Sequence, residues 1–192
     1  MALITAILLA AGASRRFGGN KLAQVLPGGD TVAAQACRRL LAASDEVVAV
    51  LRPHSEILAT QLQAVGARVV ICPAAEQGMG TSLAFGVQNS PDASAWVVAL
   101  ADMPWIQPAT VARVADALRS GATIAAPVWQ GRRGHPVGFS SALRDELLEL
   151  QGDQGAKSVL QTHSQQIRLL ACNDPGILQD IDLPSDLTIP YP

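Results

Sequence analysis

A loop dense in glycine and basic residues is the part of this sequence best suited to binding an anion. The ten residues from Gly12 to Lys21 include three glycines, two arginines and one lysine. Glycine lets backbone N–H groups approach an anion closely, and the basic side chains neutralise the charge of a phosphate chain. The other interpretation is a surface turn with solvated charges. The position of the loop directly after an apolar run favours a phosphate site, because ligands of α/β proteins bind where the strands end.

The loop matches neither of the two most common phosphate-binding patterns. A dinucleotide-binding fingerprint would place glycine at positions 12, 14 and 17, but this chain has Ser14 and Phe17 at the last two. A Walker loop requires Gly-Lys followed by Ser or Thr, but Lys21 follows Asn20 and precedes Leu22. The segment therefore predicts a phosphate-binding loop of another class.

Two acidic motifs lie far apart in the sequence, and each leads into a proline. Asp102 follows the apolar run Ala95–Ala101, and Asp180 and Asp182 lie near the end of the chain. Taken alone, each motif more often forms a helix cap or a turn. Two carboxylates from separate segments can also hold Mg²⁺ while water and phosphate fill its other positions. Asp102 and Asp182 are therefore candidate metal ligands, whereas Asp180 could serve only as a cap.

Three further segments combine small residues with polar or basic ones. Gln77–Leu83 opens a predicted helix, where glycines and hydroxyl groups leave hydrogen-bond donors free for a ligand. Alone, this segment is equally a simple capped helix start. Gly131–Val137 contains two arginines and His135, although a lone histidine more often packs or lies on the surface. Gly152–Lys157 predicts a turn into a helix.

Short apolar runs alternate with helical patterns along the chain, and these elements must position the candidate residues. The first run is continuously apolar, as expected for a parallel strand covered on both faces. The predicted strands are Leu3–Ala10, Glu46–Leu51, Arg68–Ile71, Ala95–Ala101, Ile124–Val128 and Ile167–Cys172. The predicted helices are Thr31–Ala43, Ser55–Val65, Thr81–Gln88, Pro108–Ser120, Ser140–Leu150 and Ala156–His163, with Gln130–Pro136 as a loop. The alternation predicts one α/β domain over residues 1–192, a three-layer α/β/α sandwich around a mostly parallel sheet.

The composition of the chain indicates which classes of binding partner to expect. The chain has 192 residues, a net charge of −2 at pH 7, 49% hydrophobic residues and 16% charged residues. These fractions exclude a disordered chain, and the near-neutral charge offers no basic field for nucleic acid. Any anion must therefore be held by a local site.

Cysteine usage and the first apolar run bear on the compartment. Cys37, Cys72 and Cys172 form no Cys-x-x-Cys pair, so we expect buried, reduced thiols in a cytoplasmic protein. The run Leu3–Ala11 has no basic residue before it and is shorter than a membrane span. We interpret it as a buried strand and expect neither a signal peptide nor a membrane partner.

The motifs together resemble those of the MobA-like nucleotidyltransferases. The first loop is similar to the family signature Ala-Ala/Gly-Gly-x-x-x-Arg-Met/Phe-Gly-x-x-Lys, and Asp102 and Asp182 fall on the family's Asp-x-Pro and Asp-Ile-Asp-Thr-Pro motifs. Leu183 replaces the usual threonine. The Ala-Ala-Gly, Gly-x-x-Thr-Ser, Gly-His-Pro and Gly-Asp-x-Gly-Ala motifs resemble the molybdenum cofactor cytidylyltransferase branch, with Lys157 in place of its usual arginine.

This resemblance implies a Rossmann-like nucleotidyltransferase fold and a role for each matching residue. Arg16, Lys21 and Asp102 would be catalytic, and Asp102 with Asp182 would hold Mg²⁺. Arg133 and His135 would contact the acceptor. The implied nucleotide-binding residues are Ala10, Ala11, Gly12, Ser14, Arg16, Lys21, Gly80, Thr81 and Ser82.

The implied reaction transfers CMP from CTP to the terminal phosphate of molybdopterin or the molybdenum cofactor and releases pyrophosphate. The implied protein partner is an apo-molybdoenzyme of the hydroxylase type or its chaperone. Three alternatives stay open: a GTP-using guanylyltransferase for the same cofactor, a transferase with a sugar or alditol phosphate as acceptor, and a non-catalytic carrier of the cofactor.

Overall fold

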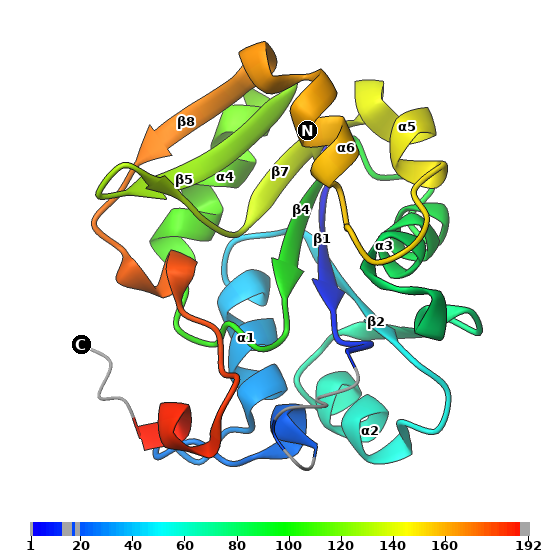
Figure 1. Ribbon diagram of the computed structural model, residues 1–192, viewed down its shortest axis with the longest axis vertical. Coiled ribbons are helices and arrows are strands. Elements are labelled where there is room, and N and C mark those ends of the chain that lie inside the picture. The colour runs from blue at the N-terminus through cyan, green and yellow to red at the C-terminus, as the bar shows by residue number, and fades with distance from the viewer. Residues whose placement is uncertain (1, 13–16, 18–19, 189–192) are drawn as a thin grey trace.

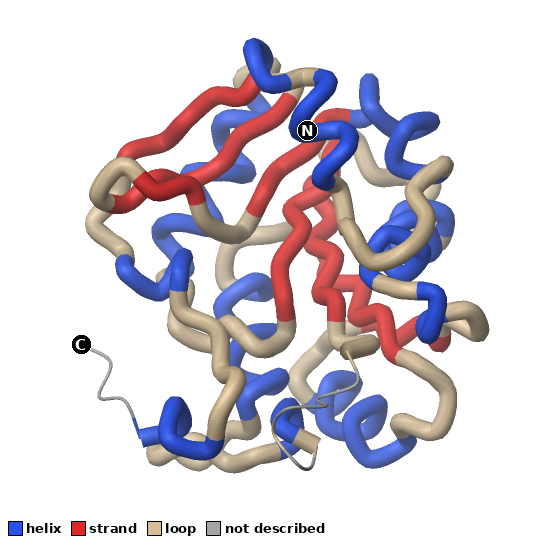
Figure 2. The backbone as a smooth tube through the Cα atoms, in the orientation of Figure 1, coloured by secondary structure: helices blue, strands red, loops and turns tan. Residues whose placement is uncertain are grey.

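Strands and helices alternate through most of the chain, as Figures 1 and 2 show. The computed structural model describes residues 2–12, 17 and 20–188. The strands are β1 (Ile4–Leu9), β2 (Glu46–Leu51), β3 (Arg68–Ile71), β4 (Ala95–Leu100), β5 (Ile124–Trp129), β6 (Arg132–Arg133), β7 (Val137–Ser140) and β8 (Ile167–Ala171). The helices are α1 (Val32–Leu41), α2 (Glu56–Ala64), α3 (Met79–Gln88), α4 (Pro108–Arg119), α5 (Arg144–Leu148) and α6 (Lys157–Thr162).

One sheet contains all eight of these strands and is mostly parallel. Its order is β3-β2-β1-β4-β7-β5-β6, and β8 pairs with the other side of β5. The pairs β3–β2, β2–β1, β1–β4 and β5–β8 are parallel, whereas β7 runs antiparallel to both β4 and β5. Every residue of the central strand β1 is buried, which agrees with its continuous apolar sequence.

The sheet is covered on both faces, so the predicted three-layer sandwich is confirmed. Ile4, Ala6 and Leu8 of β1 belong to a core cluster with residues of α1, α2 and α4. Ile7 and Leu9 point the other way and belong to a second cluster with residues of α3, α5 and α6. In Figure 1 the sheet runs from β8 at the upper left through β4 and β1 to β2 at the lower right. The carboxyl ends of the parallel strands therefore meet at one edge of the sheet.

Most helix boundaries fall close to the predicted ones, for local reasons. Thr31 caps α1, because its Oγ1 accepts a hydrogen bond from the backbone N–H of Ala34 at 3.3 Å. Pro108 occupies the first turn of α4, where no backbone donor is required. Helix α3 begins at Met79, two residues before the predicted start at Thr81.

Two sequence predictions are only partly confirmed in the region after β5. The predicted loop Gln130–Pro136 contains the two-residue strand β6, and the predicted helix Ser140–Leu150 is a 3₁₀ turn at Ser141–Leu143 followed by the short α5. The sequence pattern also does not predict the antiparallel strand β7. Its Gly138 allows α4 to pack closely, because a Cβ there would lie 2.8 Å from side-chain atoms of Val114 and Leu118. A four-residue strand with a central glycine carries little periodic signal.

The structure also bears on the expected burial of the cysteines and on the expected lack of a membrane span. All three cysteines are free thiols; Cys37 and Cys72 are buried as expected, but Cys172 is only half-buried. Burial raises the pKa of the Cys37 thiol to about 11. In the described part of the chain, no helix is long and apolar enough to cross a membrane.

Candidate functional site

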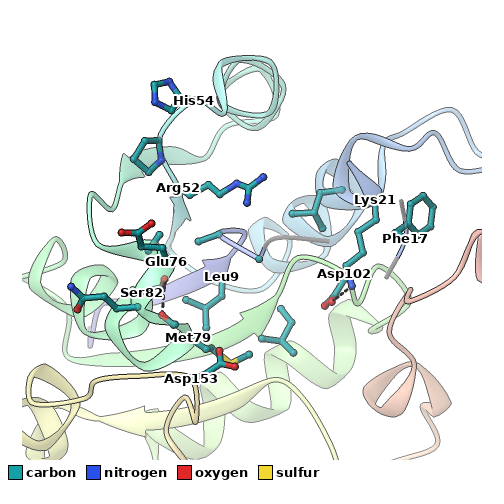
Figure 3. A pocket seen from close by; sticks show the side chains of 18 of the residues that line it. Leu9, Phe17, Lys21, Arg52, His54, Glu76, Met79, Ser82, Asp102 and Asp153 are labelled. Atoms are coloured by element: carbon teal, nitrogen blue, oxygen red, sulfur yellow. Dashed lines mark hydrogen bonds and ion pairs between the residues drawn. The ribbon is translucent and has the colours of Figure 1, made fainter. Parts of the chain in front are cut away.

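A cavity of about 1150 Å³ lies where the parallel strands end, as the strand-end rule predicts (Figure 3). The start of α3 and the loops that follow the strands line it. The lining residues include Leu9 at the end of β1, Ala11 and Gly12 after β1, Arg52, Pro53 and His54 after β2, Pro73 after β3, and Asp102 after β4. In the view of Figure 3, Lys21 and Asp102 lie at one end of the cavity and Glu76 and Ser82 at the other.

Lys21 joins the two predicted metal ligands. Its Nζ donates hydrogen bonds to Asp102 Oδ2 at 2.7 Å and to Asp182 Oδ1 at 3.2 Å. The lysine side chain is only 12% exposed, so water screens these ion pairs incompletely. Burial opposes the charge, but the hydrogen bonds and attraction of the two carboxylates outweigh it and raise the pKa of Lys21 above its usual value. Residues separated by up to 161 positions thus form one charged cluster.

The segment that carries Asp182 is fixed to the sheet. The backbone N–H of Ile181 donates to the carbonyl of Asp102 at 2.9 Å, and the Ile181 side chain is fully buried. Asp186 Oδ2 accepts from the backbone N–H groups of Asp182 and Leu183 at 2.9 and 2.8 Å. These hydrogen bonds lower the pKa of Asp186. The backbone therefore holds Asp182 beside Asp102 without help from the threonine that Leu183 replaces.

Three carboxylates converge at this end of the cavity. One oxygen each from Asp102, Asp180 and Asp182 lies within 4.8 Å of the others. Asp102 Oδ1 is buried and has no hydrogen-bond partner among the described residues. An unpaired carboxylate oxygen is costly to bury, so this atom suits a cation ligand. Asp180, whose role the sequence leaves open between a cap and a metal ligand, lies within reach of the same cation.

The start of α3 is docked on the turn around Gly152. Gly78 has a φ of 122°, and a Cβ at this position would lie 2.5 Å from the backbone of Gly152. The Gly80 N–H donates to the Gly152 carbonyl at 2.8 Å, and contact of Gly80 with the nucleotide stays a prediction. Ser82 lines the cavity, and its hydroxyl donates to the Gly78 carbonyl at 3.2 Å. Thr81 Oγ1 is buried without a hydrogen-bond partner in the described chain.

The predicted acceptor residues lie outside the lining of this cavity. Arg133 is exposed in β6. The His135 backbone N–H donates to the Ile177 carbonyl at 3.0 Å, and its Nδ1 is buried with no partner that the described residues supply. Burial lowers the pKa of His135, although Asp102 and the Val98 carbonyl favour its charged form. Contact of either residue with the acceptor stays a prediction.

The other predicted nucleotide contacts divide into three groups. Ala11 and Gly12 line the cavity, and Ala10 is buried just behind them with its N–H donating to the Val50 carbonyl at 3.0 Å. Ser14 and Arg16 lie outside the described residues. Their roles stay predictions.

Several lining residues do not follow from the sequence motifs. Arg52 and His54 follow β2, so the strand-end rule could have found them. Asp153 lies in the Gly152–Lys157 motif, to which the sequence assigns no role. Met79 lies in the Gln77–Leu83 segment but belongs to neither its glycines nor its hydroxyl groups, and Glu76 lies just before that segment.

Comparison with known proteins agrees with this architecture. A family model described as the MobA-like NTP transferase domain matches residues 6–167. "Nicotine blue oxidoreductase" of Paenarthrobacter nicotinovorans is 29% identical over 188 residues, which cover 93% of this chain and 92% of that protein. "Purine catabolism protein PucB" of Bacillus subtilis (strain 168) is 32% identical over 195 residues, covering 94% and 92%.

Solved structures of similar proteins also agree with this architecture. Rv0371c of Mycobacterium tuberculosis H37Rv superposes with a TM-score of 0.84 at 28% identity, covering 96% of this chain and 95% of that one. A structure of Rv0371C in complex with manganese has a TM-score of 0.74 at 26% identity, with 89% of each chain covered. Since the family model spans most of the chain and includes most of β1, Lys21 and Asp102, this protein belongs to the MobA-like NTP transferase family.

Proposed function

We propose that this protein transfers CMP from CTP to the terminal phosphate of molybdopterin or the molybdenum cofactor and releases pyrophosphate. The observation that carries the proposal is the cluster of Lys21, Asp102 and Asp182 at one end of the strand-end cavity. The cluster lies beside the end of β1, where the glycine-rich loop begins. Such an arrangement suits a phosphate chain that must be held and neutralised.

The chemistry asks little of the protein beyond alignment and charge neutralisation. An oxygen of the acceptor phosphate forms a bond to the α-phosphorus of CTP, and the bond from that phosphorus to the bridging oxygen breaks, releasing pyrophosphate. The acceptor is already an anion, so a general base is unnecessary. Lys21 and Arg16 would offset the charge of the triphosphate, with Arg16 assigned from the sequence motif alone.

A divalent cation fits the carboxylates, and we propose Mg²⁺. The donor set is all oxygen, and the buried, unpartnered Asp102 Oδ1 is an atom that a cation would satisfy. Asp102 and Asp182 would hold the ion, with Asp180 close enough to join them. When bound, Mg²⁺ supplies charge neutralisation for the reacting phosphates. The complex of the related Rv0371C with manganese supports a metal requirement.

Cavity size and sequence motifs support the choice of substrates. About 1150 Å³ exceeds the roughly 300–1000 Å³ of common small-molecule sites, which supports a site that takes both a nucleotide and an acceptor. Ala11, Gly12 and Ser82 belong to motifs that resemble the cytidylyltransferase branch, and all three line the cavity. CTP is therefore the proposed nucleotide in preference to GTP.

The partner and the compartment follow from the same proposal. Both curated relatives have names from the metabolism of nitrogen heterocycles, nicotine in one and purines in the other. We propose that the product passes to an apo-molybdoenzyme of the hydroxylase type or its chaperone. The free thiols and the use of CTP favour the cytoplasm as the site of reaction.

A nucleotide panel tests the proposal. The purified protein is incubated with Mg²⁺, the cofactor and CTP, GTP, UTP or ATP in turn, and pyrophosphate release is measured. We expect release with CTP well ahead of the others and none without the cofactor. Preference for GTP would indicate a guanylyltransferase, and turnover with a sugar or alditol phosphate in place of the cofactor would indicate another acceptor class. Tight cofactor binding without pyrophosphate release would indicate a carrier.

A further inference from the structure

We propose that Lys21 occupies the cation position of the aspartate pair in the nucleotide-free protein and must leave before a divalent cation can bind there. The inference rests on the proposed metal site and adds an order of events to it. The metal would enter with the nucleotide, whose phosphates attract the lysine, and not before it.

The positions of the charges support this exchange. The Lys21 ammonium contacts one oxygen of each of the two aspartates, at 2.7 and 3.2 Å, so it lies where an ion bridging them would lie. An ammonium on Asp102 Oδ2 and Asp182 Oδ1 repels a divalent cation that binds between the same two carboxylates, even where the ion also uses the unpartnered Asp102 Oδ1. Departure of the lysine would take its positive charge away from two carboxylates that lie close together.

The position of Lys21 would allow its ammonium group to move away from the two aspartates. Lys21 starts a three-residue 3₁₀ turn at the cavity wall, and its side chain ends among cavity-lining residues. A triphosphate bound against the end of β1 would offer Lys21 an alternative anionic partner. The nucleotide would thereby free the aspartates at the moment when the metal is needed.

The exchange predicts a measurable barrier to metal binding. If the lysine is withdrawn in about one molecule in 10 to 100, the apparent affinity for a metal falls by about the same factor. Lys21→Met removes the ammonium and keeps an unbranched side chain. In the absence of nucleotide, we therefore expect this variant to bind Mn²⁺ about 10-fold or more tightly than the unmodified protein.

The chain offers a matched control, because Lys21 and Lys157 are its only two lysines. Lys157 is exposed at the start of α6, so Lys157→Met makes the same change of charge away from the carboxylates. The amplitude of the free Mn²⁺ signal in electron paramagnetic resonance gives the affinity of each protein. We expect Lys157→Met to bind Mn²⁺ as the unmodified protein does, and Asp102→Asn in the Lys21→Met background to abolish the gain.

Equal Mn²⁺ affinities for Lys21→Met and the unmodified protein would overturn the proposal. So would a gain that survives Asp102→Asn, because the additional site would then lie elsewhere. The comparison uses Mn²⁺ alone, so it stands even if no nucleotide supports pyrophosphate release. Failure of the proposed function and failure of this inference are therefore separate outcomes.

Movement of the lysine itself distinguishes exchange from a simple effect of charge. With ¹⁵N-labelled lysine, the protein has only two ammonium signals, and Lys157→Met identifies which belongs to Lys21. Addition of Mg²⁺ with a non-hydrolysable CTP analogue should shift or broaden the Lys21 signal and leave the Lys157 signal in place. A Lys21 signal unchanged by saturating Mg²⁺ and analogue would overturn the proposal.

Discussion

Asp102 connects several parts of the site through its backbone and its side chain. Its carbonyl accepts a hydrogen bond from Ile181, one carboxylate oxygen pairs with Lys21, and the other is buried without a partner among the residues described. The backbone contact positions the segment that carries Asp182. The carboxylate would hold the metal, so the two functions of the residue can be separated by a substitution that keeps the shape of the side chain.

Asp102→Asn should leave the fold intact and reduce turnover about 100-fold or more, because a neutral amide holds a cation poorly. Pyrophosphate release and thermal unfolding measure the two effects. Asp116→Asn is the matched control, since this carboxylate lies on α4, is 72% exposed and pairs with Arg119. Near-normal turnover of Asp102→Asn would remove Asp102 from the metal site.

His135 gives the stability of the protein a predicted pH dependence. Burial lowers its pKa below the usual 6.5, opposed by Asp102, the Val98 carbonyl and Asp180, and assisted by Arg133. The unfolded chain therefore binds a proton near pH 6.5 that the folded protein does not. The contribution of His135 to the free energy of unfolding is therefore fully present above pH 6.5. It decreases as the pH falls below 6.5, by at most about 1.4 kcal/mol per pH unit.

Urea unfolding at pH 7.5, 6.5 and 5.5 checks this sign. His135→Gln should lose the part of the pH slope that the histidine supplies, whatever its own stability at pH 7.5. A variant whose slope equals that of the unmodified protein would show that His135 does not titrate in this way.

The key residues of the site could be predicted from the sequence, but several of its neighbours could not. Lys21, Asp102 and Asp182 stand in motifs of restricted spacing, and the structure brings them together. Asp153 reaches the cavity only because its turn docks on α3, a tertiary contact that no local pattern records.

At the scale of elements, the docking of α3 on the turn around Gly152 determines one wall of the cavity. Gly80 lies within α3, where alanine normally stabilises a helix by about 0.5–1 kcal/mol relative to glycine. A Cβ on Gly80, however, would lie 2.7 Å from the carbonyl oxygen of Gln151. The helix propensity therefore predicts that Gly80→Ala stabilises the protein, whereas the contact with Gln151 predicts that it destabilises the protein.

We expect Gly80→Ala to destabilise the protein by about 1–3 kcal/mol, because a backbone atom cannot move aside as a side chain can. Urea unfolding measures the change in the free energy of unfolding. Stabilisation by the helix-propensity amount would show that the turn does not constrain α3, and Asp153 would then have no fixed place in the cavity wall.

The elements that could be predicted are those with a strong local signal. Strands β2 and β3 match their predicted bounds, and β1 and β4 do so within one residue. For β1, β2 and β4 the reason is burial, because buried parallel strands are mostly apolar runs. Strand β7 and helix α5 have four and five residues, and they are positioned by packing on β4, β5 and α3. Their short sequences contain too few positions to show a period.

At the scale of the whole molecule, the near-neutral net charge conceals a local separation of charge. Among the described residues that line the cavity, the basic side chains are Lys21 and Arg52, and the carboxylates are Glu76, Asp102, Asp153 and Asp182. Carboxylates therefore outnumber basic side chains in this described part of the wall. A divalent cation would offset that surplus of negative charge, so we expect metal and nucleotide to bind together.

The identity of the transferred nucleotide is the central claim, and a competition measures it directly. The protein is incubated with equal concentrations of CTP and GTP, Mg²⁺ and the molybdenum cofactor, and the product is analysed by mass spectrometry. We predict a product heavier than the acceptor by one CMP, with the GMP adduct at most a minor species. A product that carries mainly GMP, or an unmodified cofactor after both nucleotides have been available, would contradict the account.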